Sequence, residues 1–248
     1  MIPTLDDDPT ETIESIKAQS VDVSKILVGV GSRKLFEELI SKASENVEFV
    51  YVKLDFRQSS GARIGHTINA ALAGVKLQDY DYILRVDADV TLPRSFLATN
   101  LKVKADMVGR FGFAVILKTF SFIKLLKGSW PELFGEDTYV VHTYLSHGYC
   151  VMNYALSPIL RRKSGVFYSW QDHFLRGVLM YKLGYEPFHA FGLALDIKAN
   201  RTNIFVIFGY ISAVIKQMEQ FEFANWIFRK QLRELVNMRK LTLNIEQS

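Results

Sequence analysis

Short apolar runs alternate with apolar residues at helical spacing in the first third of the chain. Apolar runs at Ile26–Val30, 47–54 and Tyr82–Val86 predict buried strands. Between them, apolar side chains recur every three or four residues over 35–43 and 64–75, which predicts two helices. Strands that alternate with helices favour an α/β fold with a mostly parallel sheet covered by helices.

The start of the chain fits the same pattern. Residues 1–5 have the composition of a strand that ends in a loop. Asp8 is then placed to cap a helix, with Pro9 in its first turn and Glu11 three residues after the cap. We therefore expect a first helix directly after a first strand.

The rest of the chain is less regular. Residues 111–126 are strongly apolar, and their pattern permits either a strand or an amphipathic helix. Residues 148–155 predict a strand, and 185–191 predict a strand or a loop. Asp172 begins a predicted helix that ends at Gly184.

From residue 202 onward the spacing of apolar residues is helical. With 248 residues and 49% hydrophobic residues, the chain has material for one large core and a small appendage. We place the boundary near Lys198, which gives a domain over 1–198 and a helical tail over 199–248.

The formal net charge is +4, and much of the excess lies in two stretches where bulky apolar residues separate the charges. This mixture favours an anionic membrane surface or a phosphate-bearing substrate over duplex nucleic acid, for which no motif is present. An apolar tail of this kind also suits a homodimer interface. The basic residues are Lys102, Lys104, Arg110, Lys118, Lys124 and Lys127, and then Arg229, Lys230, Arg233, Arg239 and Lys240.

Other features bear on the compartment. The longest apolar run near the tail, Ile204–Ile215, is too short to span a membrane. The start of the chain is acidic and lacks the apolar core of a secretory signal, and Cys150 is the only cysteine. We expect a cytoplasmic protein that associates peripherally with the cytoplasmic face of a membrane.

Asp87 and Asp89 are the strongest chemical signal in the sequence. They follow the predicted strand Tyr82–Val86, at the position where open α/β sheets bind ligands. On an extended chain, side chains two residues apart point to the same face. Two carboxylates on one face suit Mg²⁺ or Mn²⁺ that takes its other ligands from phosphates and water. A nucleoside-diphosphate substrate is the first expectation, although an acidic strand end without function has the same pattern.

The order of the motifs resembles the family-2 inverting glycosyltransferases with the GT-A fold. The resemblance covers roughly residues 1–198 and implies a three-layer α/β/α domain with a mixed, mostly parallel sheet. It is carried by Ile2-Pro3-Thr4-Leu5, Gly61-Ala62-Arg63-Ile64-Gly65 with Asn69-Ala70-Ala71, Tyr82 to Asp89, His147 to Ala155 with Gly165-Val166-Phe167, and Trp170 to Arg176 with Lys182 to Tyr185.

The resemblance implies hexosyl transfer with inversion, from a UDP- or GDP-sugar to a hydroxyl or phosphate on a glycan or a lipid-linked acceptor. It implies that Asp89 holds the metal, with Asp87 reaching the metal or the ribose. It also implies that Asp172 is the base that activates the acceptor, with Gln171 in place of a common Glu. The implied nucleotide-binding residues are Pro3, Thr4, Arg63 and Asp87. The family's usual aspartates after the second strand are absent at 29–31, which leaves the choice between UDP and GDP open.

Several alternatives remain. Glu136-Asp137 is a second acidic pair that could supply the base, and His189 is a candidate metal ligand. Trp130 and Trp170 suit either sugar stacking or core packing. The run from Val86 to Thr91 also resembles the start of haloacid-dehalogenase-like phosphatases, in which Asp87 would be the nucleophile. A nucleotide- or sugar-binding module without catalysis is the third possibility.

Overall fold

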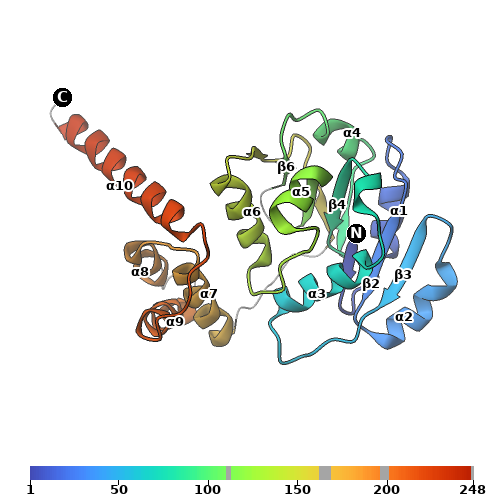
Figure 1. The fold of residues 1–248 in the computed structure, drawn as a ribbon, viewed down its shortest axis with the longest axis horizontal. Coiled ribbons are helices and arrows are strands. Elements are labelled where there is room, and N and C mark those ends of the chain that lie inside the picture. The colour runs from blue at the N-terminus through green and yellow to red at the C-terminus, as the bar shows by residue number, and fades with distance from the viewer. Residues whose placement is uncertain (110–112, 162–168, 196–200, 247–248) are drawn as a thin grey trace. The chain divides into compact units, whose positions relative to one another are not determined.

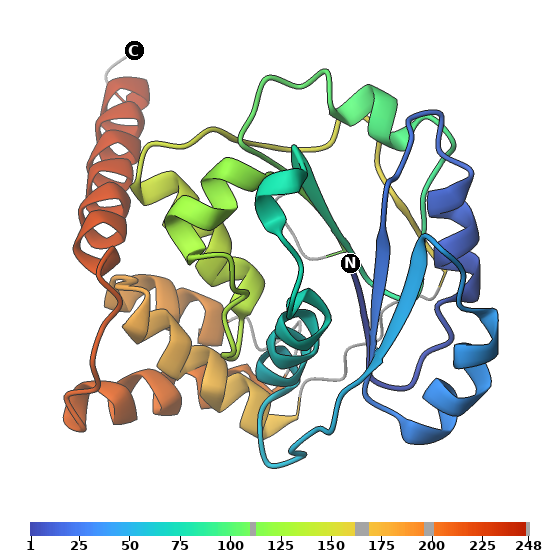
Figure 2. The same cartoon turned by 45° about the vertical axis from the view of Figure 1, so that its right-hand side comes forward.

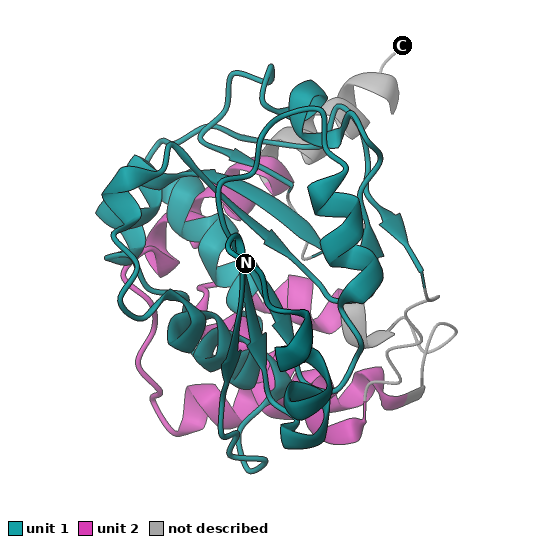
Figure 3. Cartoon of the chain, turned by 90° about the vertical axis from the view of Figure 1, so that its right-hand side faces the viewer, with its two compact units in different colours: residues 1–165 teal, residues 166–248 magenta. Residues whose placement is uncertain are grey.

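The computed structural model describes residues 1–109, 113–161, 169–195 and 201–246, and it forms two compact units, Met1–Gly165 and Val166–Ser248 (Figure 3). The predicted boundary near Lys198 lies outside the described residues. The division between the units comes earlier because helix α7 (Trp170–Lys182) packs along helix α9 (Ile204–Ile215) and so belongs with the tail.

Unit 1 is built on a sheet whose first three strands are parallel, in the order β1-β2-β3. The N-terminal amine of Met1 donates to the Leu84 carbonyl at 2.7 Å, and the Val86 amide donates to the Met1 carbonyl at 3.0 Å. This is the hydrogen-bond pattern of a parallel pair, so β4 lies beside β1. The bounds are β1 (Ile2–Thr4), β2 (Ile26–Val30), β3 (Val47–Tyr51) and β4 (Tyr82–Val86).

The second half of the sheet continues from β4 in the order β4-β7-β6-β8. Strand β7 is antiparallel to both β4 and β6, whereas β8 is parallel to β6. The predicted mixed, mostly parallel sheet is therefore confirmed. The bounds are β6 (Met107–Val108), β7 (Ala114–Lys118) and β8 (Val151–Met152), and β5 (Val90–Thr91) pairs separately with β9 (Ile159–Leu160).

Helices cover both faces of this sheet, which makes the three layers expected from the sequence (Figures 1 and 2). Strand β2 shows why: Val28 and Val30 enter one core, while Leu27 enters the other. The first core packs under α1 (Thr10–Lys17), α2 (Arg33–Leu39) and α4 (Phe96–Asn100). The second packs under α3 (Ser60–Leu72), α5 (Thr119–Leu126) and α6 (Glu136–Ser146).

Three predicted elements differ from the structure. The apolar run 111–126 contains both a strand, β7, and the helix α5 that follows it directly. The strand predicted over 148–155 is reduced to β8, because Gly148 adopts a positive φ of 77° to end α6. Residues expected as a strand or loop over 185–191 begin a helix, α8 (Pro187–Leu195). Its first turn is capped by the Glu186 carboxylate, which accepts the Phe188 amide at 2.6 Å.

Unit 2 consists of helices, with α7, α8 and α9 followed by α10 (Ala224–Glu246). Two glycines let α7 and α9 approach at backbone distance. A Cβ atom at Gly177 would collide with the Val206 carbonyl oxygen, and one at Gly209 would collide with that of Phe174. Among the described residues, no helix is both long enough and apolar enough to cross a membrane.

This packing predicts that Gly177→Ala and Gly209→Ala each destabilise unit 2. The added methyl group has no space, and overpacking of this kind costs about 1–3 kcal/mol. Gly192→Ala on α8 is the matched control, because a Cβ there meets no atom and alanine favours a helix by up to about 1 kcal/mol. Hydrogen exchange at the amides of α7 and α9, measured in urea, reports the difference. Equal protection in all three variants would show that the helices do not depend on this contact.

Candidate functional site

A buried arginine lies where strand β4 ends. Arg85 faces the α6 side of the sheet and is only 2% exposed. One of its guanidinium nitrogens is 2.7 Å from an Asp87 carboxylate oxygen and 3.9 Å from one of Glu136. Its guanidinium carbon lies 5.8 Å from the centre of the Trp130 ring. The cation therefore connects the end of β4 with the start of α6.

Glu136 reaches this position through the loop 130–135. Asn69 holds the loop, because its side chain accepts the Trp130 amide at 2.6 Å and donates to the Trp130 carbonyl at 2.9 Å. Gly61 and Gly65 on α3 provide the space, since a Cβ atom at either position would collide with the backbone of this loop. At Gly61 it would also stand 2.5 Å from a carboxylate oxygen of Glu136. Two glycines of the segment 61–65, which carries part of the family resemblance, thus make room for Glu136 beside Arg85.

The carboxylates of this cluster repel one another and are poorly solvated. Burial raises the pKa of Asp87 to about 6, with Arg85 opposing the rise and Asp89 and Asp137 adding to it. Burial likewise raises the pKa of Glu136 to about 7, against the Arg85 charge and with the help of Asp137 and Asp87. Asp137 is the second residue of α6 and accepts the Thr138 amide at 2.7 Å. The acidic pair 136–137, which sequence reasoning ranked second, is therefore within electrostatic reach of Asp87.

The sequence suggested that Asp87 and Asp89 lie on one face of an extended strand. In the structure they do not. The chain turns at 87–90, where the Val90 amide donates to the Asp87 carbonyl at 3.2 Å. Asp87 pairs with Arg85, whereas Asp89 lines a separate hollow. The turn is tied down at Ala88, whose carbonyl accepts both the Thr12 hydroxyl and the Arg161 guanidinium.

The hollow beside Asp89 has a volume of about 300 Å³ and is mostly acidic. It is formed by the β1–α1 loop, the first turn of α1 and the turn 87–90. Arg161 supplies a positive charge and pairs with Glu11 at 3.0 Å. The lining residues are Asp7, Asp8, Thr10, Glu11, Asp89 and Arg161. The carboxyl ends of the parallel strands β1 and β4 lie at this edge of the sheet, which is the usual place for a ligand in such sheets.

The carboxylates near the hollow fit a divalent cation that takes most of its ligands from a bound phosphate and water. Within the described parts of the chain, no three His, Cys, Asp or Glu side chains come together as ligands. Mg²⁺ in nucleotide sites commonly takes one or two carboxylates and completes its shell with phosphates and water. Asp89, which lines the hollow, can supply one such carboxylate.

The predicted nucleotide-binding residues have mixed surroundings. Pro3 and Thr4 are buried in β1, and the Thr4 hydroxyl donates to the Asp7 carbonyl at 2.5 Å. They shape the loop that lines the acidic hollow. Arg63 lies on α3 with its guanidinium carbon 5.2 Å from the centre of the Phe56 ring. Its buried Nε has no hydrogen-bond partner among the residues that the structure describes.

The predicted base lies in unit 2. Ser169 caps α7, and Asp172 is the third residue of that helix rather than its first. The Asp172 carboxylate accepts the Ser169 amide at 2.9 Å and its hydroxyl at 2.7 Å, which completes a capping box. Gln171 is exposed beside it. His189 lies in a helix, α8, and not at the end of a strand as expected.

The remaining candidates include residues that the sequence did not single out. Trp130 is buried and packs in the core of unit 1, whereas Trp170 is 51% exposed. The fragment Gly165-Val166-Phe167 is outside the described residues. Arg85 and Arg161 were missed. The sequence could have drawn attention to Arg85, because it is the one charged residue in the apolar run Tyr82–Val86. A charged residue in a buried strand needs a partner of opposite charge.

Comparisons with known proteins add a distant structural similarity. No family model matches the chain, and no curated protein matches it. Among solved structures, the mannosyltransferase PcManGT from Pyrobaculum calidifontis, in complex with GDP-Man and Mn²⁺, aligns with a TM-score of 0.49 at 17% identity. The alignment covers 71% of this chain and 59% of that chain, so the similarity spans less than two thirds of that structure.

The raised pKa of Glu136 predicts how stability depends on pH. Its pKa is about 7 in the folded chain and 4.5 in the unfolded chain, so the folded state holds the proton more tightly. Unit 1 should lose stability as the pH rises from about 4.5 to 7, by up to roughly 3 kcal/mol from this group. Glu136→Gln removes that contribution, and its stability should fall less over the same range in urea unfolding with EDTA present.

Glu45→Gln, at an exposed position of the turn before β3, is the control and should follow the wild-type profile. If Glu136→Gln also followed it between pH 5 and 8, Glu136 would not be titrating in the folded chain as described.

Proposed function

We propose that this chain is a metal-dependent glycosyltransferase that moves a hexosyl group from a UDP- or GDP-sugar to an acceptor hydroxyl or phosphate, with inversion. One observation carries the proposal. Two acidic motifs from different elements are linked through Arg85, which pairs with Asp87 after β4 and with Glu136 at the start of α6. Asp89 and Asp137, the other members of the two motifs, act electrostatically on Asp87. Metal-dependent sugar transfer needs one carboxylate that holds the metal ion at the leaving diphosphate. It needs another that takes the proton from the acceptor.

The donor side of this proposal lies at the acidic hollow. Asp89, with Asp87, would hold Mg²⁺ or Mn²⁺, which when bound neutralises the charge of the leaving diphosphate. The β1–α1 loop gives the hollow its shape. Arg63 on α3 would contact the diphosphate or the nucleotide base, which is the role that the resemblance implies for it.

The acceptor side has two candidate bases. Asp137 is favoured, because it is half-buried at the start of α6 in the same unit as Asp87 and acts on that carboxylate electrostatically. Glu136 is less accessible, since its side chain is 8% exposed and pairs with Arg85. Asp172, with Gln171 beside it, is the second candidate and already accepts two hydrogen bonds from Ser169.

The reaction is one in-line displacement. The acceptor oxygen forms a bond to the anomeric carbon while the bond from that carbon to the diphosphate oxygen breaks. The acceptor proton passes to the carboxylate base, and the electron pair of the broken bond leaves with the diphosphate. Because the acceptor displaces the diphosphate in one step from the opposite side, an α-linked donor gives a β-linked product.

The test is a panel of nucleoside diphosphates and their sugars, measured with Mn²⁺ or with EDTA, by calorimetry for binding and by release of nucleoside diphosphate for transfer. Wild-type binding should require the metal, and Asp89→Ala should bind weakly and without metal dependence. Asp137→Asn should bind the donor but transfer roughly 10²-fold more slowly. Asp172→Asn and the exposed Asp22→Asn should behave like wild type.

The opposite outcomes are equally specific. If Asp172→Asn loses transfer while Asp137→Asn keeps it, the base is on α7. Retention of the donor's anomeric configuration would contradict inversion. Release of phosphate from a monoester without any sugar donor would point to a phosphatase that uses Asp87. Donor binding without turnover in any condition would indicate a binding module.

A further inference from the structure

Helix α9 presents an uncovered apolar face. Ile204, Phe208, Ile211 and Ile215 lie on one side at spacings of four, three and four residues, with exposed fractions of 43%, 53%, 41% and 74%. The opposite side is buried against α7 at Val206, Gly209, Tyr210 and Ala213. The helix contains no charged residue. A helix that is apolar on all sides is normally covered on all sides, so an uncovered face of this kind is a candidate interaction surface.

The neighbouring helix α8 extends the same surface. It packs beside α9 and contains no Asp, Glu, Lys or Arg. Phe188 is 75% exposed and Phe191 is 42% exposed. Exposed aromatic side chains next to an uncharged helix are characteristic of segments that lie in the interfacial region of a bilayer.

Helix α10 adds positive charge to this unit. Its first turns are anchored on the α7–α8 connection, where the Gln231 side chain accepts the Glu186 amide at 2.9 Å and Ala224 packs on Gly184. Phe228, Leu232 and Leu235 form an apolar stripe at spacings of four and three residues, with exposed fractions of 40%, 41% and 39%.

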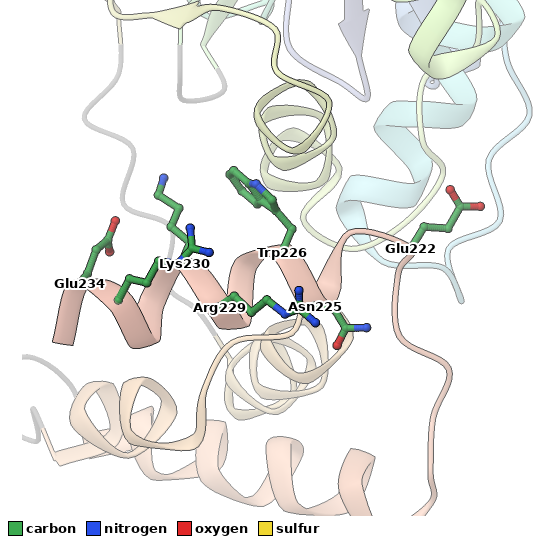
Figure 4. Close-up of a pocket in the computed structure, with 7 residues that line it drawn as sticks. Glu222, Asn225, Trp226, Arg229, Lys230 and Glu234 are labelled. Atoms are coloured by element: carbon green, nitrogen blue, oxygen red, sulfur yellow. The ribbon is translucent and has the colours of Figure 1, made fainter. Parts of the chain in front are cut away.

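Basic residues occupy the side of α10 away from that stripe. Arg229, Lys230 and Arg233 line a hollow of about 550 Å³, together with Trp226 and the carboxylates of Glu222 and Glu234. Trp226 and Lys230 project from the same side of α10, with the ammonium 5.3 Å from the centre of the ring (Figure 4). A helix with an apolar stripe on one side and Lys and Arg on the other is the pattern of helices that lie on anionic membranes.

We infer that the outward faces of α8 and α9 and the first turns of α10 bind the surface of an anionic lipid bilayer. The strongly exposed side chains of α9 are those of Ile, Phe and Val, so this face has no hydrogen-bonding side chain with which to select a protein partner. At about 18 Å, α9 is too short to span the hydrocarbon core and instead lies in its plane. Between Ala224 and Glu246 the sequence has five Lys or Arg residues against two Glu, which suits anionic headgroups better than a second basic copy of the chain.

The apolar segment 114–126 in unit 1 is mostly buried. Val115, Ile116 and Leu117 are buried in the sheet, and Phe122 and Leu126 are buried in the core of unit 1. Phe120 alone of the large apolar residues over 114–126 is strongly exposed, at 71%. That segment is therefore not part of the inferred membrane surface, and this inference does not depend on the proposed enzymatic function.

Flotation with vesicles tests the inference on the full chain. Vesicles of phosphatidylcholine with phosphatidylglycerol should carry the protein upward, and vesicles of phosphatidylcholine alone should carry much less. Phe208→Ser with Ile211→Ser should weaken binding about tenfold or more, because two large apolar side chains no longer enter the bilayer. Arg229→Gln with Lys230→Gln and Arg233→Gln should weaken binding to the anionic vesicles and remove its dependence on salt.

Phe120→Ser is the control, because Phe120 is a still more exposed aromatic residue in unit 1, and this variant should bind like wild type. Circular dichroism of each variant checks that the helices remain folded. Three results would overturn the inference: no binding to anionic vesicles, binding that the α9 variant leaves unchanged, or a dimer in light scattering that the α9 variant converts to a monomer.

Discussion

The site of this protein depends on one buried cation. Arg85 lies inside a strand that is otherwise apolar, and its guanidinium is removed almost completely from water. A buried charge without partners is strongly destabilising, so the fold must bring carboxylates to it. Asp87 follows Arg85 by two residues, just after β4 ends, whereas Glu136 is the first residue of α6, about fifty residues later in the chain. The loop 130–135, the Asn69 hydrogen bonds and the glycines of α3 are all arranged so that this second carboxylate reaches the cation.

This arrangement links structure to chemistry. The same interaction that neutralises Arg85 places an acidic helix start next to the turn that carries Asp89. Burial raises the pKa values of Asp87 and Glu136, and the charge of Arg85 opposes that rise without cancelling it. A divalent cation at Asp89 would relieve that repulsion. Unit 2 has a different character, with helices joined by a glycine contact and an apolar face that suits a membrane.

Much of the fold was predictable from local patterns. Strands β2 and β4 begin and end where their apolar runs do, since both are buried on two faces. Asp87 and Asp89 were found because a carboxylate pair after a buried strand is visible in the sequence. Their different surroundings were not predictable, because a tight turn at 87–90 breaks the two-residue alternation on which the argument relied. The role of Glu136 depends on contacts with Gly61, seventy-five positions earlier, and no local pattern contains that information.

A double-mutant cycle between Arg85 and Glu136 tests the central interaction most directly. The free energy of unfolding is measured at pH 8 for wild type, Arg85→Met, Glu136→Gln and the double variant. Arg85→Met alone should cost about 3–5 kcal/mol, because it leaves two buried carboxylates without their cation. In the Glu136→Gln background the same change should cost at least about 1 kcal/mol less, since one of those charges is gone. If the two effects were additive within about 0.5 kcal/mol, Arg85 would not be coupled to Glu136, and the link between the two acidic motifs would be wrong.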